Sequence, residues 1–82
     1  MDQATIRSDI QRVLAETLGV DQSAITPDAD SASIEGWDSV NHLNIVLALE
    51  TTFGVSFEPE EIEAMASVAG VERVVAAKLG AI

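Results

Sequence analysis

The chain contains no cysteine, which excludes disulfide bonds, thiolate metal ligands and a protein thiol nucleophile. Only two prolines and five glycines interrupt its 82 residues, so long helices are permitted. Aromatic residues make up 4% and Lys plus Arg number four, which argues against a surface that binds nucleic acids. No apolar run reaches the roughly 18 residues of a membrane span, and residues 1–5 lack the features of a signal peptide. The sequence therefore predicts a cytoplasmic protein with no membrane span and no nucleic-acid partner.

Apolar and acidic residues are abundant instead. Hydrophobic residues make up 48%, enough for a core in a chain near the lower size limit of stable domains. We therefore expect one domain over residues 1–82, and a monomer. Fourteen Asp and Glu residues against four Lys and Arg give a net charge of −10, which steers basic partners toward the surface. Alternatively, the acidic surface serves only to keep the protein soluble.

Hydrophobic residues at helical spacing, flanked by capping residues, predict three longer helices and one short helix. The expected segments are Thr5–Leu18, Asp38 or Ser39 to Phe53, Pro59–Met65, and Val68–Leu79 with Ser67 as its cap. Glycine follows each of the longer segments, as expected of helix C-caps. These features predict an all-α fold, a small up-down four-helix bundle.

A long connection, Asp21–Trp37, joins the first two predicted helices. A structureless loop of that length is uncommon in a compact domain. We therefore expect Ile25, Ile34 and Trp37 to hold it on the core, with a short helical turn at Ser23–Ile25.

The second predicted helix has two apolar stripes. One consists of Ile45, Val46, Leu49 and Phe53, and the other of Val40, Leu43 and Leu47. Because so small a bundle cannot bury every side of a helix, we expect the second stripe to stay partly exposed beside Ser39 and to serve in docking. The alternative is that the long loop covers it.

Catalysis needs convergent groups, and this sequence supplies few. His42 is the single histidine and lies three residues after Ser39, but a serine–histidine pair also needs an orienting group and an oxyanion site. We therefore expect His42 at the core edge or on the surface. Asp28 and Asp30 begin like a calcium loop, but Ser33 stands where glycine is required, and Ser39 where glutamate is required. The sequence thus predicts neither an enzyme nor a metal site.

The pair Asp38-Ser39 at a helix start has two interpretations. Either side chain can cap the helix by accepting a hydrogen bond from a first-turn amide. Alternatively, Ser39 is a covalent attachment point, because helix amides and the helix dipole favour a phosphate at this position.

The order of motifs resembles the acyl carrier protein family over almost the whole chain. The matching residues are Gly36–Val40, Leu43, Leu47, Leu49–Glu50, Phe53–Val55, Pro59–Ile62, Met65 and Ser67–Val68. The resemblance implies that Ser39 carries 4′-phosphopantetheine, whose thiol holds an acyl group as a thioester, and that a phosphopantetheinyl transferase reads Asp38. It also implies that the second helix meets the acyl-loading and acyl-using enzymes, and that the interior can shelter an acyl chain. The implied partner-facing residues are Val40, Asn41, Asn44, Leu47 and Glu50.

The chain departs from the family pattern on this second helix. Asn41, Asn44 and Thr51 occupy positions that often carry carboxylates in members serving fatty acid synthesis, and Val40 stands where leucine is commonest. Losing those charges would change which enzymes bind, chiefly through the association rate. We therefore expect a free-standing, specialised acyl carrier in fatty acid, lipid or polyketide-type biosynthesis. The alternatives are an aminoacyl or peptidyl carrier of a specialised-metabolite pathway, and an unmodified helical protein-interaction domain.

Overall fold

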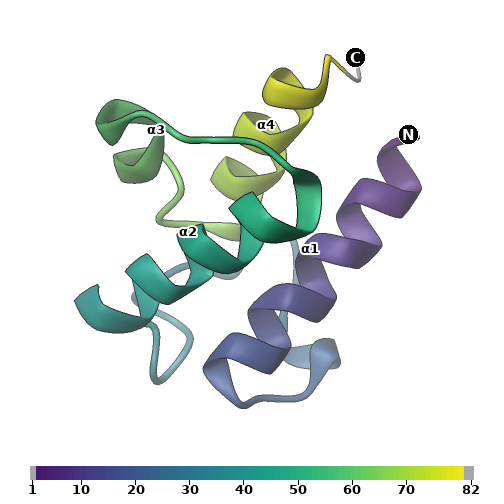
Figure 1. Ribbon diagram of the computed structural model, residues 1–82. Helices are drawn as coiled ribbons and strands as arrows, with labels where there is room; N and C mark the ends of the chain where they lie inside the picture. The colour runs from purple at the N-terminus through teal and green to yellow at the C-terminus, as the bar shows by residue number, and fades with distance from the viewer. Residues whose placement is uncertain (1, 81–82) are drawn as a thin grey trace.

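A computed structural model of the protein describes residues 2–80 (Figure 1). Within these residues the chain forms four α-helices and one 3-10 turn. The elements are α1 (Gln3–Leu18), η1 (Gln22–Ala24), α2 (Ser39–Phe53), α3 (Pro59–Glu63) and α4 (Val68–Leu79). Helix α1 contacts both α2 and α4. Three longer helices and one short helix confirm the predicted all-α bundle, and none of the described helices is long and apolar enough to cross a membrane.

Each longer helix begins at a side-chain cap and ends at a glycine. The caps are Asp2, Asp38 and Ser67, which accept from the amides of Thr5, Asn41 and Gly70 at 2.8, 2.8 and 3.0 Å. The final glycines adopt φ values of 66–70°, in the left-handed region that residues with a Cβ rarely enter. The predicted ends of α2 and α4 are therefore confirmed.

Two predicted helix boundaries are wrong by two residues. Helix α1 starts at Gln3 instead of Thr5, because Asp2 supplies a cap ahead of the first apolar residue. Helix α3 ends at Glu63 instead of near Met65, because the Met65 amide bonds to the Ile62 carbonyl at 3.2 Å in a tighter turn. That turn directs the fully buried Met65 side chain into the core.

The short helix α3 is stabilised at its start by reciprocal hydrogen bonds. Glu58 and Glu61 form a capping box, in which the Glu61 carboxylate accepts from the Glu58 amide at 2.7 Å. This hydrogen bond, assisted by Lys78 at 2.9 Å, lowers the pKa of Glu61 below its ordinary value. Lys78 thereby ties the last turn of α4 to α3.

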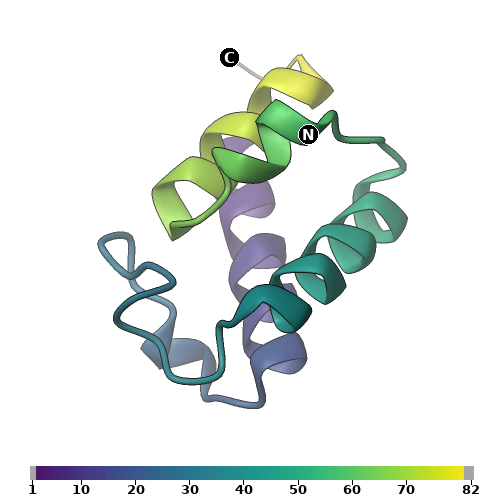
Figure 2. The same cartoon turned by 90° about the vertical axis from the view of Figure 1, so that its left-hand side faces the viewer.

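The long loop packs onto the core as predicted. Ile25, Ile34 and Trp37 are buried, and the 3-10 turn forms one residue earlier than expected. The loop also pairs with the residues before α4, where the Ser31 amide donates to the Ala66 carbonyl at 2.9 Å. Figure 2 shows this loop crossing beneath the helices before it enters α2.

Candidate functional site

Asp38, not Ser39, caps helix α2. The Asp38 Oδ1 atom accepts from the Asn41 amide at 2.8 Å, and Ser39 is the first helical residue. Ser39 is exposed, and its hydroxyl has no hydrogen-bond partner within residues 2–80. The capping interpretation of Ser39 therefore does not hold, because its neighbour already performs that role.

The chain reaches Ser39 through a tight turn at Gly36. Gly36 has a φ of 93°, a conformation that strains any residue with a Cβ. Its carbonyl accepts from the Asp38 amide at 3.0 Å and from the Asn41 side-chain amide at 2.7 Å. These bonds join the turn to the first turn of α2 and hold the backbone on both sides of Ser39.

A buried tryptophan and the single histidine lock the same segment to its neighbours. The Trp37 indole N–H donates to His42 Nδ1 at 3.0 Å, and His42 Nε2 lies 2.9 Å from the Ile62 carbonyl oxygen. Because the indole can only donate, Nδ1 must be the unprotonated nitrogen and Nε2 must carry the hydrogen. The imidazole thus bridges the loop to α3 from the core edge, which confirms the expected position of His42.

This bonding pattern leaves His42 no role as a base for Ser39. Both ring nitrogens are engaged, one by Trp37 and the other by the Ile62 carbonyl. A nucleophilic serine requires a free acceptor nitrogen within hydrogen-bond reach. The Ser39 hydroxyl is therefore exposed and has no base in His42.

The first turn of α2 also suits a negatively charged group. Among the described residues, the amides of Ser39 and Val40 have no backbone acceptor, as expected at a helix start. These amides and the helix dipole stabilise a phosphate attached nearby. In Figure 1 this turn lies on the opposite side of the molecule from the start of α1 and the end of α4, and its residues Ser39 and Val40 are exposed.

The predicted second stripe of α2 is uncovered. Val40, Leu43 and Leu47 are 70%, 57% and 61% exposed, and they are the large hydrophobic residues that the described chain leaves exposed. The opposite stripe is largely buried, with Ile45, Val46 and Leu49 in the core and Phe53 half-buried against it. The alternative that both stripes are covered, the second of them by the long loop, is therefore wrong.

The polar residues expected to face partners differ in their solvent exposure. Asn44 is exposed and donates to the Asn41 side-chain oxygen at 3.3 Å, while Asn41 is half-buried. Glu50 is half-buried, and one of its carboxylate oxygens accepts from the Phe57 amide at 2.9 Å. Glu50 therefore holds the chain after α2 in place, a role that the sequence did not indicate.

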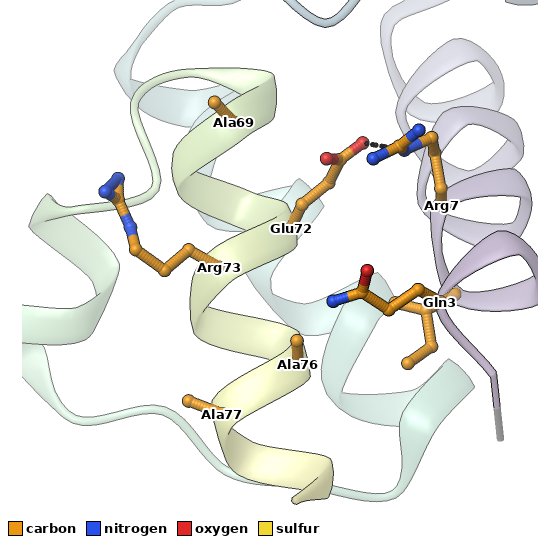
Figure 3. A pocket seen from close by; sticks show the side chains of 8 residues that line it. Gln3, Arg7, Ala69, Glu72, Arg73, Ala76 and Ala77 are labelled. Atoms are coloured by element: carbon orange, nitrogen blue, oxygen red, sulfur yellow. Dashed lines mark hydrogen bonds and ion pairs between the residues drawn. The ribbon is translucent and has the colours of Figure 1, made fainter. Parts of the chain in front are cut away.

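A groove elsewhere on the molecule plays no part in this site. It has a volume of about 440 Å³ and lies between α1 and α4, lined by Ile6, Ala69 and Ala76, with the ion pair of Arg7 and Glu72 at its rim (Figure 3). Ser39 does not line it. The exposed start of α2 is therefore separate from this groove.

Fold and site together define a small helical bundle with an exposed serine, Ser39, at the start of α2. The family model described as "Phosphopantetheine attachment site" matches residues 8–75. An acyl carrier protein of Helicobacter pylori strain G27 is 40% identical over 63 residues, which cover 77% of this chain and 81% of that protein. An acyl carrier protein of Rubrobacter xylanophilus is 35% identical over 68 residues, which cover 83% and 84%.

The fold comparison agrees with the sequence comparisons. The solution NMR structure of a holo acyl carrier protein from Geobacter metallireducens is similar with a TM-score of 0.81 and 22% identity, covering 90% of this chain and 85% of that one. The chain belongs to the phosphopantetheine-attachment family of acyl carrier proteins. It is a carrier and not an enzyme, and its cofactor is covalently attached 4′-phosphopantetheine.

Proposed function

We propose that Ser39 is the residue that carries 4′-phosphopantetheine, and that the chain is a free-standing, specialised acyl carrier of fatty acid, lipid or polyketide-type biosynthesis. The bound group would supply the thiol that the chain lacks, and the acyl cargo would be held on it as a thioester. The observation that carries the proposal is the exposed Ser39 hydroxyl, left without a partner beside the capping Asp38.

The residues around Ser39 each have a part in this proposal. The Gly36 turn and the Trp37–His42 hydrogen bond fix the position of the helix start, so that a transferase meets a preformed surface. Oδ1 of Asp38 is used in the cap, but Oδ2 makes no hydrogen bond within the described part of the chain. That oxygen is open to a phosphopantetheinyl transferase, in keeping with the recognition role proposed for Asp38.

Mass spectrometry tests the attachment residue directly. The protein is incubated with coenzyme A, Mg²⁺ and a broad-range transferase, and we expect one phosphopantetheinyl group per chain. Ser39→Ala should gain none, while Ser56→Ala, which removes an exposed serine outside α2, should be modified like the original protein. Modification that persists in Ser39→Ala would refute the assignment.

The same Ser39 also suits an aminoacyl or peptidyl cargo, and the weakly charged surface of α2 favours considering it. Only one residue of α2, Glu50, carries a formal charge. Loading the modified protein with acyl and with aminoacyl donors, and comparing the yields of thioester, separates the two candidates. A single carrier domain over residues 1–82, a monomer and a cytoplasmic location stay predictions.

A further inference from the structure

Among the four α-helices, α2 has the fewest charged residues, in a molecule that is otherwise acidic. The α2 ridge, which we define as Val40, Leu43 and Leu47, lies on one side of the helix because these residues are three and four apart. It begins immediately after Ser39. Its polar neighbours three or four positions away are Asn44 and Thr51, which are exposed and neutral, and the half-buried Glu50, whose carboxylate accepts from the Phe57 amide.

The remaining charges lie on other elements. Helix α2 contains one of the 18 charged residues of the chain, Glu50, which is half-buried and has one carboxylate oxygen engaged by the Phe57 amide. Four charged residues lie on α1, three on α3 and three on α4. A net charge of −10 therefore surrounds a docking surface that has almost none of its own.

From this distribution we propose that enzymes acting at Ser39 recognise the α2 ridge through an uncharged hollow lined by aliphatic or aromatic side chains, and need no arginine or lysine opposite α2. This inference rests on the proposed function, because it assumes that enzymes must approach Ser39. Burying three exposed apolar side chains supplies binding free energy that salt does not screen. A row of basic residues would lose its hydration here without gaining an acidic partner.

The occupant is a partner enzyme and not a second copy or a lipid surface. Two copies of a chain with a net charge of −10 repel each other, and anionic lipid heads repel the same surface. An enzyme that modifies Ser39 must also contact the residues beside it, and the ridge starts at the next position. The ridge is thus placed where such an enzyme has to bind.

Transferase kinetics can test the chemistry of docking. Two phosphopantetheinyl transferases serve as probes, one with an apolar carrier-binding face and one whose face is rich in arginine and lysine. We expect the apolar enzyme to show the lower KM, changing less than about threefold between roughly 50 and 500 mM NaCl, because apolar contacts are not screened. Leu43→Gln/Leu47→Gln should raise that KM about tenfold, equivalent to about 1.4 kcal/mol. The control Ala77→Gln, at an exposed position on α4, should not.

Added charge provides the reciprocal test. Asn44→Glu/Thr51→Glu places two carboxylates at the edge of the ridge and should shift the preference toward the basic transferase. Its control, Ser8→Glu/Ala77→Glu, carries the same net charge at exposed positions on α1 and α4, and should leave the preference unchanged. Circular dichroism of each variant confirms the fold.

The possible results separate the two proposals. If the protein is modified and Leu43→Gln/Leu47→Gln leaves the KM of the apolar transferase unchanged, the ridge proposal alone is overturned. A lower KM with the basic transferase than with the apolar one would also overturn it. Failure of both transferases to modify the protein would remove the attachment function, and the ridge proposal with it. Self-association in light scattering that disappears in Leu43→Gln/Leu47→Gln would assign the ridge to a second copy and also overturn the proposal.

Discussion

At the residue scale, Asp38 combines a structural role with a proposed recognition role, and two substitutions separate them. Asp38→Ala removes the cap of α2 and should lower the free energy of unfolding by about 1 kcal/mol. Asp38→Asn keeps an acceptor oxygen for the Asn41 amide, so its stability should stay close to that of the original protein. If the transferase reads the carboxylate, both variants should be modified more slowly. Urea unfolding and the initial modification rate measure the two effects.

The informative outcome is the behaviour of Asp38→Asn. A stable Asp38→Asn protein that is modified at the original rate would show that the charge is not read and that Asp38 acts only as a cap. Ser39→Ala is the matched control for stability. Its side chain makes no bond within residues 2–80, so the change should stay within about 0.5 kcal/mol.

Single residues were predictable from the sequence where one local rule decides their position. Gly19 and Gly54 end their helices because a left-handed residue is required there. Ser39 was ambiguous, because Asp38 and Ser39 are both good caps and propensity does not choose between them. The family pattern placed Glu50 on the partner face, but its half-buried carboxylate also accepts from the Phe57 amide. That contact depends on the path of the chain after α2.

At the scale of elements, the hydrogen bonds through His42 join three segments: the loop before Ser39, α2 and α3. Trp37→Phe removes the indole donor, and His42→Leu removes the ring nitrogens that bridge to Ile62. Each substitution should lower the free energy of unfolding by about 1–2 kcal/mol, since a buried polar group loses its partner. A double-mutant cycle should give a coupling free energy of about 0.5–1.5 kcal/mol between Trp37 and His42.

The single tryptophan offers a second measurement of this contact. Trp37 gives the one indole N–H signal in an NMR spectrum, and we expect that proton to exchange slowly with solvent. His42→Leu should make the exchange faster, because the indole loses its acceptor. Additive effects of the two substitutions on stability would show that the hydrogen bond contributes nothing by itself.

Elements were easier to predict than the contacts between them. Apolar spacing and caps identified four helices, since both are local features of the sequence. The pairing of the loop with the start of α4, where the Val68 amide donates to the Ala29 carbonyl at 3.0 Å, joins residues 39 apart in the chain. Backbone amides and carbonyls are the same in every residue, so no side-chain pattern predicts such a pairing.

At the scale of the whole molecule, the sequence separates three surfaces around one core. The long loop and α3 carry acidic residues, α1 and α4 carry the cations, and α2 presents apolar residues beside Ser39. The core could be predicted because each of the three longer helices has one buried apolar side. The exposure of the α2 ridge followed from size alone, since a bundle of this length cannot surround a helix that is apolar on two sides.

Charge repulsion across the whole molecule predicts how stability responds to salt. A net charge of −10 within a radius of gyration of 11.3 Å opposes folding by an amount on the order of several kcal/mol at low ionic strength. Four ion pairs within residues 2–80 oppose this repulsion; all are partly exposed and worth about 0.2–1 kcal/mol each. Salt screens both terms, but the repulsion is larger, so raising NaCl from about 10 to 500 mM should raise Tm by about 5 °C or more.

Glu63→Lys tests whether repulsion is the cause of that salt dependence. The residue is exposed and forms no ion pair within the described chain, and the substitution changes the net charge from −10 to −8. Because repulsion grows with the square of the net charge, Tm at low salt should increase, and its rise with NaCl should become smaller. Thermal unfolding followed by circular dichroism measures both quantities. A Tm that fell with added NaCl would show instead that the ion pairs of α1 and the Lys78–Glu61 contact outweigh the repulsion between acidic residues.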